Sequence, residues 1–163
     1  MKVKDLRDLV HVCLLVLVPG LLAWLCGRPL IFPSLGPSAL AIVLDEKGNR
    51  ARQVIGGHLV GVLSGLIAYH LLARGLSLAA LTPALSTDGL RIVASGVVSV
   101  GLASLAMLTT RTTHAPACAT TLIVSLGVLP SLLDGTLIMV AVVLLFLSCR
   151  LLRLVWKSDT TSL

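Results

Sequence analysis

Charged residues are scarce in this chain of 163 residues, at 12% of the sequence, and aromatic residues are scarcer still, at 3%. An average soluble domain carries roughly 25% charged residues, so this shortage excludes an ordinary soluble protein. Leu, Val, Ala and Ile are abundant instead: 56% of residues are hydrophobic, and the mean hydropathy is +1.03. This composition predicts an integral membrane protein with lipid-facing helices.

The sequence also lacks the residue groupings of common catalytic and metal sites. It contains no Ser/His/Asp grouping, no pair of intramembrane carboxylates and no His-Glu-x-x-His. Its four histidines have no carboxylate partner, and its four cysteines form no Cys-x-x-Cys pair. We therefore expect no enzymatic activity, no metal and no cofactor.

Basic residues outnumber acidic ones and give a net charge of +6. They lie between apolar runs rather than in one patch, which argues against nucleic-acid binding. We interpret them as residues that set membrane topology, because cytoplasmic loops are enriched in Lys and Arg.

Four apolar runs approach the roughly 20 residues that a membrane span needs. They cover residues 9–27, 54–73, 92–110 and 136–156. The first follows a basic start without a convincing cleavage site, and we interpret it as a retained signal anchor. We expect a single transmembrane domain over residues 1–163, with a connector at 74–91 and a short C-terminal tail.

Two interrupted segments, 29–44 and 111–135, lie between these runs. Pro29, Pro33, Gly36 and Pro37 predict an extended entry followed by a half-helix in the first segment. Irregular backbone at membrane depth is tolerated only where protein or a water-filled cavity satisfies it. The sequence therefore predicts an all-α polytopic membrane protein with broken helices.

The two halves of the chain repeat the same order of elements. An offset of 82 residues places run 10–27 on 92–109, Phe32–Leu40 on His114–Leu122, and 54–73 on 136–155. Few residues are identical, but both halves read apolar run, interrupted segment, apolar run. This order predicts two repeats, about 9–73 and about 92–156, in a pattern common among transporters.

Two topologies are open. If both interrupted segments cross the membrane, the repeats are inverted and the cytoplasmic side collects the basic residues Lys2, Lys4, Arg7, Lys47, Arg50, Arg52, Arg111, Arg150, Arg153 and Lys157. If they are re-entrant, four spans remain, the halves are parallel and the basic residues divide more evenly. The positive-inside rule favours the six-crossing inverted repeat with both termini in the cytoplasm.

Both interrupted segments place small and hydroxyl residues just before a short apolar stretch. Helix N-termini carry free N–H groups and partial positive charge, so two of them meeting near the midplane would bind an anion. The candidate substrate-binding residues in these segments are Pro33, Ser34, Gly36, Ser38, Arg111, His114, Pro116, Thr120 and Thr121. The alternative is purely structural: kinks packed for shape, with hydroxyls bonded to nearby carbonyls.

His58 is a further candidate, because an ionisable residue within a span is a functional hypothesis by default. It lies beside a glycine stripe, Gly57, Gly61 and Gly65, whose spacing of four allows close helix approach. The sequence leaves open whether this stripe packs inside one protomer or between protomers.

At these residues the chain resembles the HPP family of integral membrane proteins, named for a His-Pro-Pro motif. The matching residues run in family order as Phe32-Pro33-Ser34-Leu35-Gly36, Gly56-Gly57-His58 and Thr113-His114-Ala115-Pro116. Ala115 stands where the family has its first proline, and Cys118 where glycine is usual. The resemblance implies a membrane domain and, from plant and cyanobacterial relatives, nitrite transport.

These inferences predict a transporter or channel for a small inorganic anion, with nitrite the leading candidate. The alternative is a non-transporting membrane scaffold or regulatory subunit. A polar cavity lined by both interrupted segments would favour transport, and a dry, packed centre would count against it. We expect a multi-pass homo-oligomer in the lipid bilayer of the cell (inner) membrane.

Overall fold

The computed structural model describes residues 3–45, 49–80 and 82–159, and the regular structure in those ranges is entirely helical. Two of the basic residues predicted to set topology, Lys2 and Lys47, lie outside these ranges. A 3₁₀ turn over Pro29–Ile31 precedes α2, and a π-helical turn over Tyr69–Ala73 extends α3. The α-helices are α1 (Val3–Leu25), α2 (Phe32–Leu44), α3 (Ala51–Ala68), α4 (Thr87–Thr110), α5 (Ala117–Ser125) and α6 (Leu132–Asp159).

Four of these helices are long and apolar enough to cross a membrane. The qualifying stretches are Leu6–Leu25, Ala51–Ala73, Thr87–Thr110 and Leu132–Leu154. They confirm the four apolar runs as helices. α4 begins inside the predicted connector, at Thr87, because the Ser86 hydroxyl accepts a hydrogen bond from the Gly89 N–H and caps the helix.

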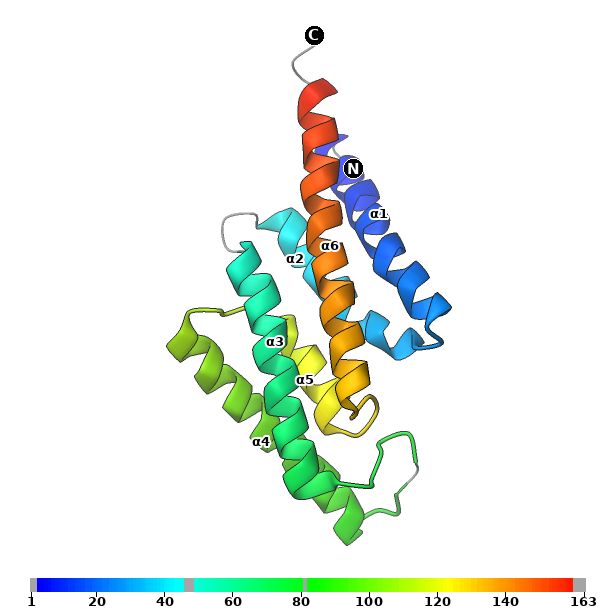
Figure 1. Cartoon of the computed structure of the whole chain (residues 1–163), viewed down its shortest axis with the longest axis vertical. Helices are drawn as coiled ribbons and strands as arrows, with labels where there is room; N and C mark the ends of the chain where they lie inside the picture. The colour runs from blue at the N-terminus through cyan, green and yellow to red at the C-terminus, as the bar shows by residue number, and fades with distance from the viewer. Residues whose placement is uncertain (1–2, 46–48, 81, 160–163) are drawn as a thin grey trace.

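The chain reverses direction at each connection, so α1 begins and α6 ends at the same end of the molecule (Figure 1). α3 and α6 lie side by side in the centre. α1 packs on α2 and α6, whereas α4 packs on α3 and α5. Each half therefore contributes its last long helix to the packing of the other half.

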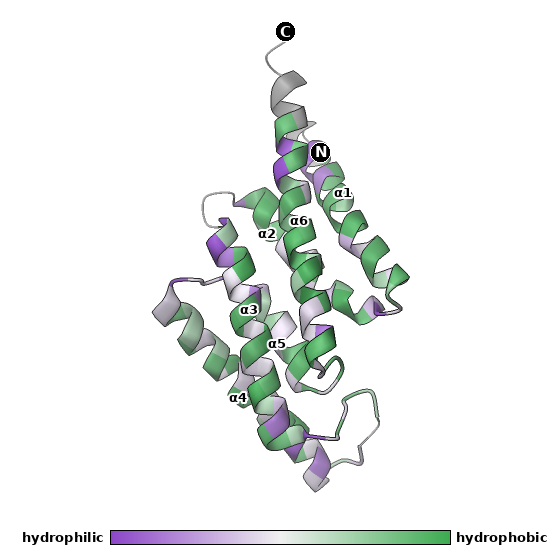
Figure 2. Cartoon of the chain, viewed as in Figure 1, coloured by the Kyte–Doolittle hydropathy of each residue, from purple (hydrophilic) through white to green (hydrophobic). Residues whose placement is uncertain are grey.

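Hydrophobic residues make up most of each long helix, and hydrophilic residues gather at helix ends and loops (Figure 2). Many of the large apolar side chains of these helices are exposed on the outside of the bundle. The peripheral helices are the least covered by protein. In the apolar stretch of α1, 22% of the residues are buried, and in that of α4, 33%, against 56% in α3. Such exposed apolar helices suit hydrocarbon rather than water as their surroundings.

The predicted extended entry over 29–37 is wrong, because this segment is helical. Pro33 lies in the first turn of α2, where a helix leaves its N–H groups unpaired in any case. Pro37 removes one hydrogen bond farther along, and the helix continues through it. The hydroxyls of Ser34 and Ser38 donate to backbone carbonyls of Ile31 and Ser34 along the same stretch.

The glycine stripe of α3 packs inside the protomer, which answers the question that the sequence left open. A Cβ on Gly57 would lie 2.8 Å from the His114 Cβ, and one on Gly61 would lie 2.9 Å from the Ala117 carbonyl oxygen. A Cβ on Gly65 would meet Val124 in the same way. Because these three glycines have no side chains, the α4–α5 loop and α5 pack directly against the backbone of α3.

Two polar contacts join helix ends from different halves. Arg28, after α1, forms a 2.8 Å ion pair with Asp134 in the first turn of α6. Arg52, in the first turn of α3, donates a 2.7 Å hydrogen bond to the carbonyl of Thr110 at the end of α4. Both contacts fix where a long helix of one half begins against the other half.

Candidate functional site

His58 on α3 lies at the point where the two interrupted segments meet. Its Nε2 is 2.9 Å from the Ser38 Oγ on α2, and its Nδ1 is 2.7 Å from the Thr120 Oγ1 on α5. All three side chains are completely buried. The imidazole thus bridges the two short helices through one hydroxyl on each.

His114, in the loop between α4 and α5, extends this contact into a longer chain. Its ring centroid lies 5.3 Å from that of His58, and its Nε2 is 3.3 Å from the same Ser38 Oγ. Its Nδ1 is 2.8 Å from the Asn49 Oδ1. We call Asn49, His114, Ser38, His58 and Thr120 the central network.

Asn49 sets the orientation of His114. Its Nδ2 donates to the carbonyls of Ala41 and Asp45 at the end of α2, so its Oδ1 is left to accept. The His114 Nδ1 is therefore the donor, and in a neutral ring its Nε2 must accept. The Ser38 hydroxyl carries one proton but faces two acceptors, namely the Ser34 carbonyl and the His114 Nε2. The His58 Nε2, at 2.9 Å, donates to or accepts from the same hydroxyl according to the tautomer of its ring.

The structure brings four of the predicted residues together, namely Ser38, His58, His114 and Thr120, and Ser34 contributes its carbonyl. Thr121 is buried but donates to the Ala117 carbonyl, and its hydroxyl packs against Gly61. The other predicted residues lie outside the network: Arg111 and Pro33 are exposed, while Gly36 and Pro116 are half-buried.

The α5 N-terminus does not offer the free amides that we expected of it. The N–H groups of Ala117, Cys118 and Ala119 donate to the carbonyls of residues 114, 115 and 116. They are occupied because the chain enters α5 through a tight turn rather than an extended strand. The interrupted segments therefore meet through side chains, not through two converging helix dipoles.

Asn49 is the member of the network that sequence reasoning missed. It follows a charged loop and precedes the first turn of α3, where a Gly-Asn pair normally indicates only a turn. Its role depends on the C-terminal end of α2, whose carbonyls accept hydrogen bonds from its Nδ2. No local pattern in the sequence reports that contact.

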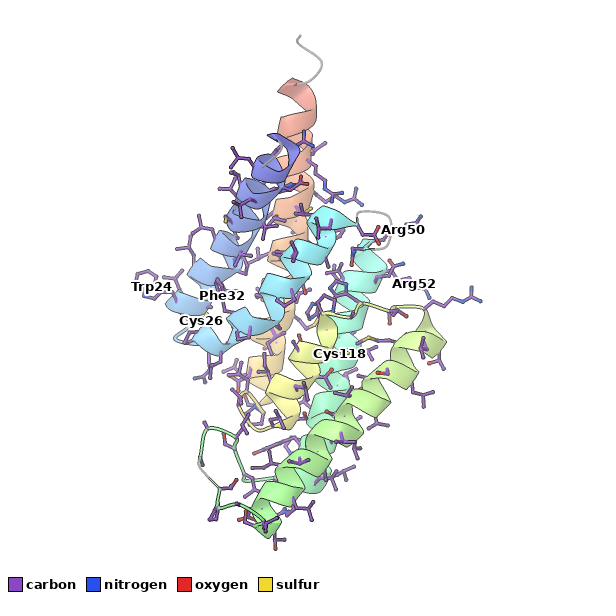
Figure 3. All side chains as sticks on the ribbon, turned by 180° about the vertical axis from the view of Figure 1, so that it is seen from behind. Trp24, Cys26, Phe32, Arg50, Arg52 and Cys118 are labelled. Carbon is purple, nitrogen blue, oxygen red and sulfur yellow. The ribbon has the colours of Figure 1, made fainter. Side chains whose placement is uncertain are left out.

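The paired histidines do not form the beginning of a larger ligand set. Over residues 3–45, 49–80 and 82–159, no group of three or more His, Cys, Asp or Glu side chains is arranged to hold a metal ion. The cysteine nearest in sequence to the network is Cys118, on the first turn of α5 in the middle of the molecule (Figure 3).

The side chains at the two connections of α2 differ in character. Figure 3 shows Arg50 and Arg52 at the start of α3, close to where α2 finishes. Trp24, Cys26 and Phe32 lie around the junction of α1 and α2, on the opposite side of the view. Asn49, next to Arg50 in the chain, is the member of the central network on the arginine side.

An all-helical bundle with four apolar helices of membrane-spanning length and a buried polar centre defines a multi-pass membrane protein. A family model described as "HPP, transmembrane region" matches residues 4–158. The chain therefore belongs to the HPP family of membrane proteins. Searches of the curated proteins and of the solved structures with this chain found no match.

Proposed function

We propose that this protein moves a small inorganic anion across the membrane, at the place where α2 and α5 meet on His58. The observation that carries the proposal is the buried network itself. Burying several polar side chains among apolar helices is unfavourable unless they bond one another, and within a membrane such groups commonly mark a pathway. We propose transport rather than catalysis, since the partners of the two histidines in the described part of the chain are hydroxyls and an amide, with no carboxylate to complete a catalytic set.

The positions of the two hydroxyls support a duplicated site. Ser38 and Thr120 are separated by 82 residues, the offset that aligns the two halves of the chain. His58 bonds to both of them. We therefore infer that equivalent positions on equivalent short helices face one shared side chain, as in transporters built from inverted repeats.

The contacts at the helix ends obey the same offset. Adding 82 to Arg28 gives Thr110, and adding 82 to Arg52 gives Asp134. The contact between Arg28 and Asp134 is thus equivalent to the one between Thr110 and Arg52. This correspondence supports a two-fold repeat, which we propose to be the inverted repeat with six crossings, in which α2 and α5 cross as short helices.

Nitrite is the leading substrate because it is what the family resemblance implies. The hydroxyls of Ser38 and Thr120 and an imidazole N–H are donors that a small oxyanion accepts. We further propose that the protein is a homo-oligomer in the inner membrane, with both termini in the cytoplasm. The basic residues of the six-crossing topology favour that orientation.

The second candidate is a membrane scaffold or regulatory subunit that transports nothing. One observation favours it: Ser38, His58 and Thr120 have no exposed surface and bond to one another, so the centre is closed in this conformation. If the protein is a transporter, the network must open and exchange its internal hydrogen bonds for bonds to the anion.

The test is uptake of nitrite into proteoliposomes, with nitrate, formate and chloride measured alongside. Ser38→Ala and His114→Ala should each lower the uptake rate by about tenfold, since losing a buried hydrogen-bond partner costs roughly 1–3 kcal/mol. The matched control is Ser95→Ala. Its hydroxyl is equally buried but donates to the Ser125 carbonyl, between α4 and α5 and outside the network.

The comparison separates the two candidates. Wild-type flux that falls in Ser38→Ala and His114→Ala but persists in Ser95→Ala supports transport through the network. A folded wild-type protein that moves none of these anions favours the scaffold. Flux that all three variants share would locate transport elsewhere in the molecule.

A further inference from the structure

A cavity with arginines on its wall lies at the outer end of the central network. It has a volume of about 420 Å³ and lies between the end of α2, the start of α3 and the last turns of α6. Arg50, Arg150 and Arg153 line it, together with Asn49 and the apolar side chains of Ile42 and Phe146. We call this cavity the basic vestibule.

The arginines are held in place by contacts with the helices. Arg153 donates a 2.8 Å hydrogen bond to the Ile42 carbonyl near the end of α2. The guanidinium of Arg150 lies 5.5 Å from the centre of the Phe146 ring, one turn earlier on α6. Arg50 is the N-cap residue of α3, close to where α2 finishes (Figure 3).

Asn49 connects the vestibule to the buried centre. It lines the cavity and also accepts the hydrogen bond from His114, which reaches Ser38 and His58 in turn. Asn49 therefore belongs both to the wall of the open, charged cavity and to the central network. The remaining members of the network lie deeper than Asn49, which is itself half-buried.

We propose that the basic vestibule is the binding site at which soluble small inorganic anions collect before they enter the central network. The proposal rests on the proposed transport function and specifies how the protein recognises its substrate on one side of the membrane. Charges of one sign around a concave site raise the local concentration of the opposite ion by about tenfold or more.

The size of the cavity indicates what it does. A water molecule occupies roughly 30 Å³, so the vestibule accommodates an anion together with many of its waters. A hydrated anion is attracted by charge but is not selected by fit. The vestibule should therefore accept nitrite, nitrate and chloride alike, and discrimination should belong to the central network.

The test uses the full chain in oriented membrane vesicles, in which uptake is measured from each side separately. The double variant Arg50→Gln with Arg150→Gln should raise the KM for nitrite by about tenfold at the face where the vestibule opens. The maximal rate, and the KM at the opposite face, should change little. The matched control is Arg74→Gln, an exposed arginine after α3 at the other end of that helix.

Nitrite binding to the purified protein, measured by calorimetry, separates failure of this inference from failure of the proposed function. Wild-type binding that is weakened in the double variant and kept in Arg74→Gln supports the vestibule even if no flux is found. Unchanged binding and unchanged KM in the double variant overturn the vestibule, although transport through the network would stand.

The lipid content of the vesicles distinguishes a soluble anion from a lipid phosphate. The KM effect should persist in vesicles made only of zwitterionic lipid, and it should shrink as salt screens the arginines. If instead the double variant differs from wild type only when anionic lipid is present, the cavity holds a lipid headgroup and the proposal is wrong.

Discussion

At the scale of single residues, His58 is informative because both of its nitrogens have partners from different halves of the chain. The sequence singled out this histidine, and it also singled out Ser38, His114 and Thr120 as separate candidates. It could not show that they share one network, because their contacts cross between segments 20 to 76 residues apart. The sequence could not identify Asn49 either, because its partner His114 is 65 residues away.

Adjacent threonines on α5 allow a matched comparison. Thr120→Val removes the hydroxyl that faces the His58 Nδ1, so we expect uptake of the transported anion to fall by about fivefold or more. Thr121→Val removes a hydroxyl that bonds only to a backbone carbonyl of its own helix, and uptake should remain near wild type. Equal effects of the two substitutions on flux would contradict a specific role for Thr120.

The second residue-scale prediction concerns Asn49. Asn49→Asp keeps an oxygen facing His114 but loses the amide that donates to the carbonyls of Ala41 and Asp45. We expect the α2–α3 loop to loosen and uptake to fall by about fivefold, because His114 loses its oriented partner. Hydrogen exchange over residues 41–45, measured beside the flux, checks this; unchanged exchange and flux would contradict it.

At the scale of elements, the sequence predicted the four long helices well because each is a continuous apolar run. It failed on α2, where proline was taken as a helix breaker. Pro33 occupies the first turn, where its missing N–H is harmless, and position within a helix cannot be known before its start is known. Packing of the glycine stripe was likewise undecided until its partner, α5, was located.

The stripe supports a stability prediction. A Cβ added by Gly61→Ala would lie 2.8 Å from the Thr121 Oγ1 and 2.9 Å from a backbone carbonyl oxygen, so we expect destabilisation of about 1–3 kcal/mol. Gly101→Ala, in the interior of α4 with nothing within 4 Å of the added carbon, is the control. It should be neutral or stabilising by up to about 1 kcal/mol. Thermal unfolding in detergent measures both, and a similar loss in the two would refute the close packing of α3 on α5.

At the scale of the whole molecule, an offset of 82 residues relates corresponding contacts in the two halves of the chain. It relates the two hydroxyls on His58 and the two contacts at the helix ends, and it supports a fold of two interlocked halves. The distribution of basic residues favours the six-crossing topology over re-entrant segments, but the sequence alone does not decide between the two. Lipid-exposed helices and a polar centre agree with either one.

Cysteine accessibility in a cysteine-free background decides the number of crossings. Leu30→Cys, just before α2, and Asp45→Cys, just after it, should be labelled by a membrane-impermeant reagent from opposite sides of the membrane. The inverted repeat requires this result, because α2 crosses between them. Labelling of both positions from the same side would establish a re-entrant segment and overturn the six-crossing topology.

The most direct test of the central claim is the initial rate of nitrite uptake into proteoliposomes containing wild-type protein or His58→Gln. Matched amounts of folded protein are required, and protein-free liposomes give the baseline. Because His58 joins both halves of the site, we predict uptake well above the baseline for wild type and uptake at the baseline for His58→Gln. Equal uptake by the two proteins would contradict the claim that the anion crosses where α2 and α5 meet.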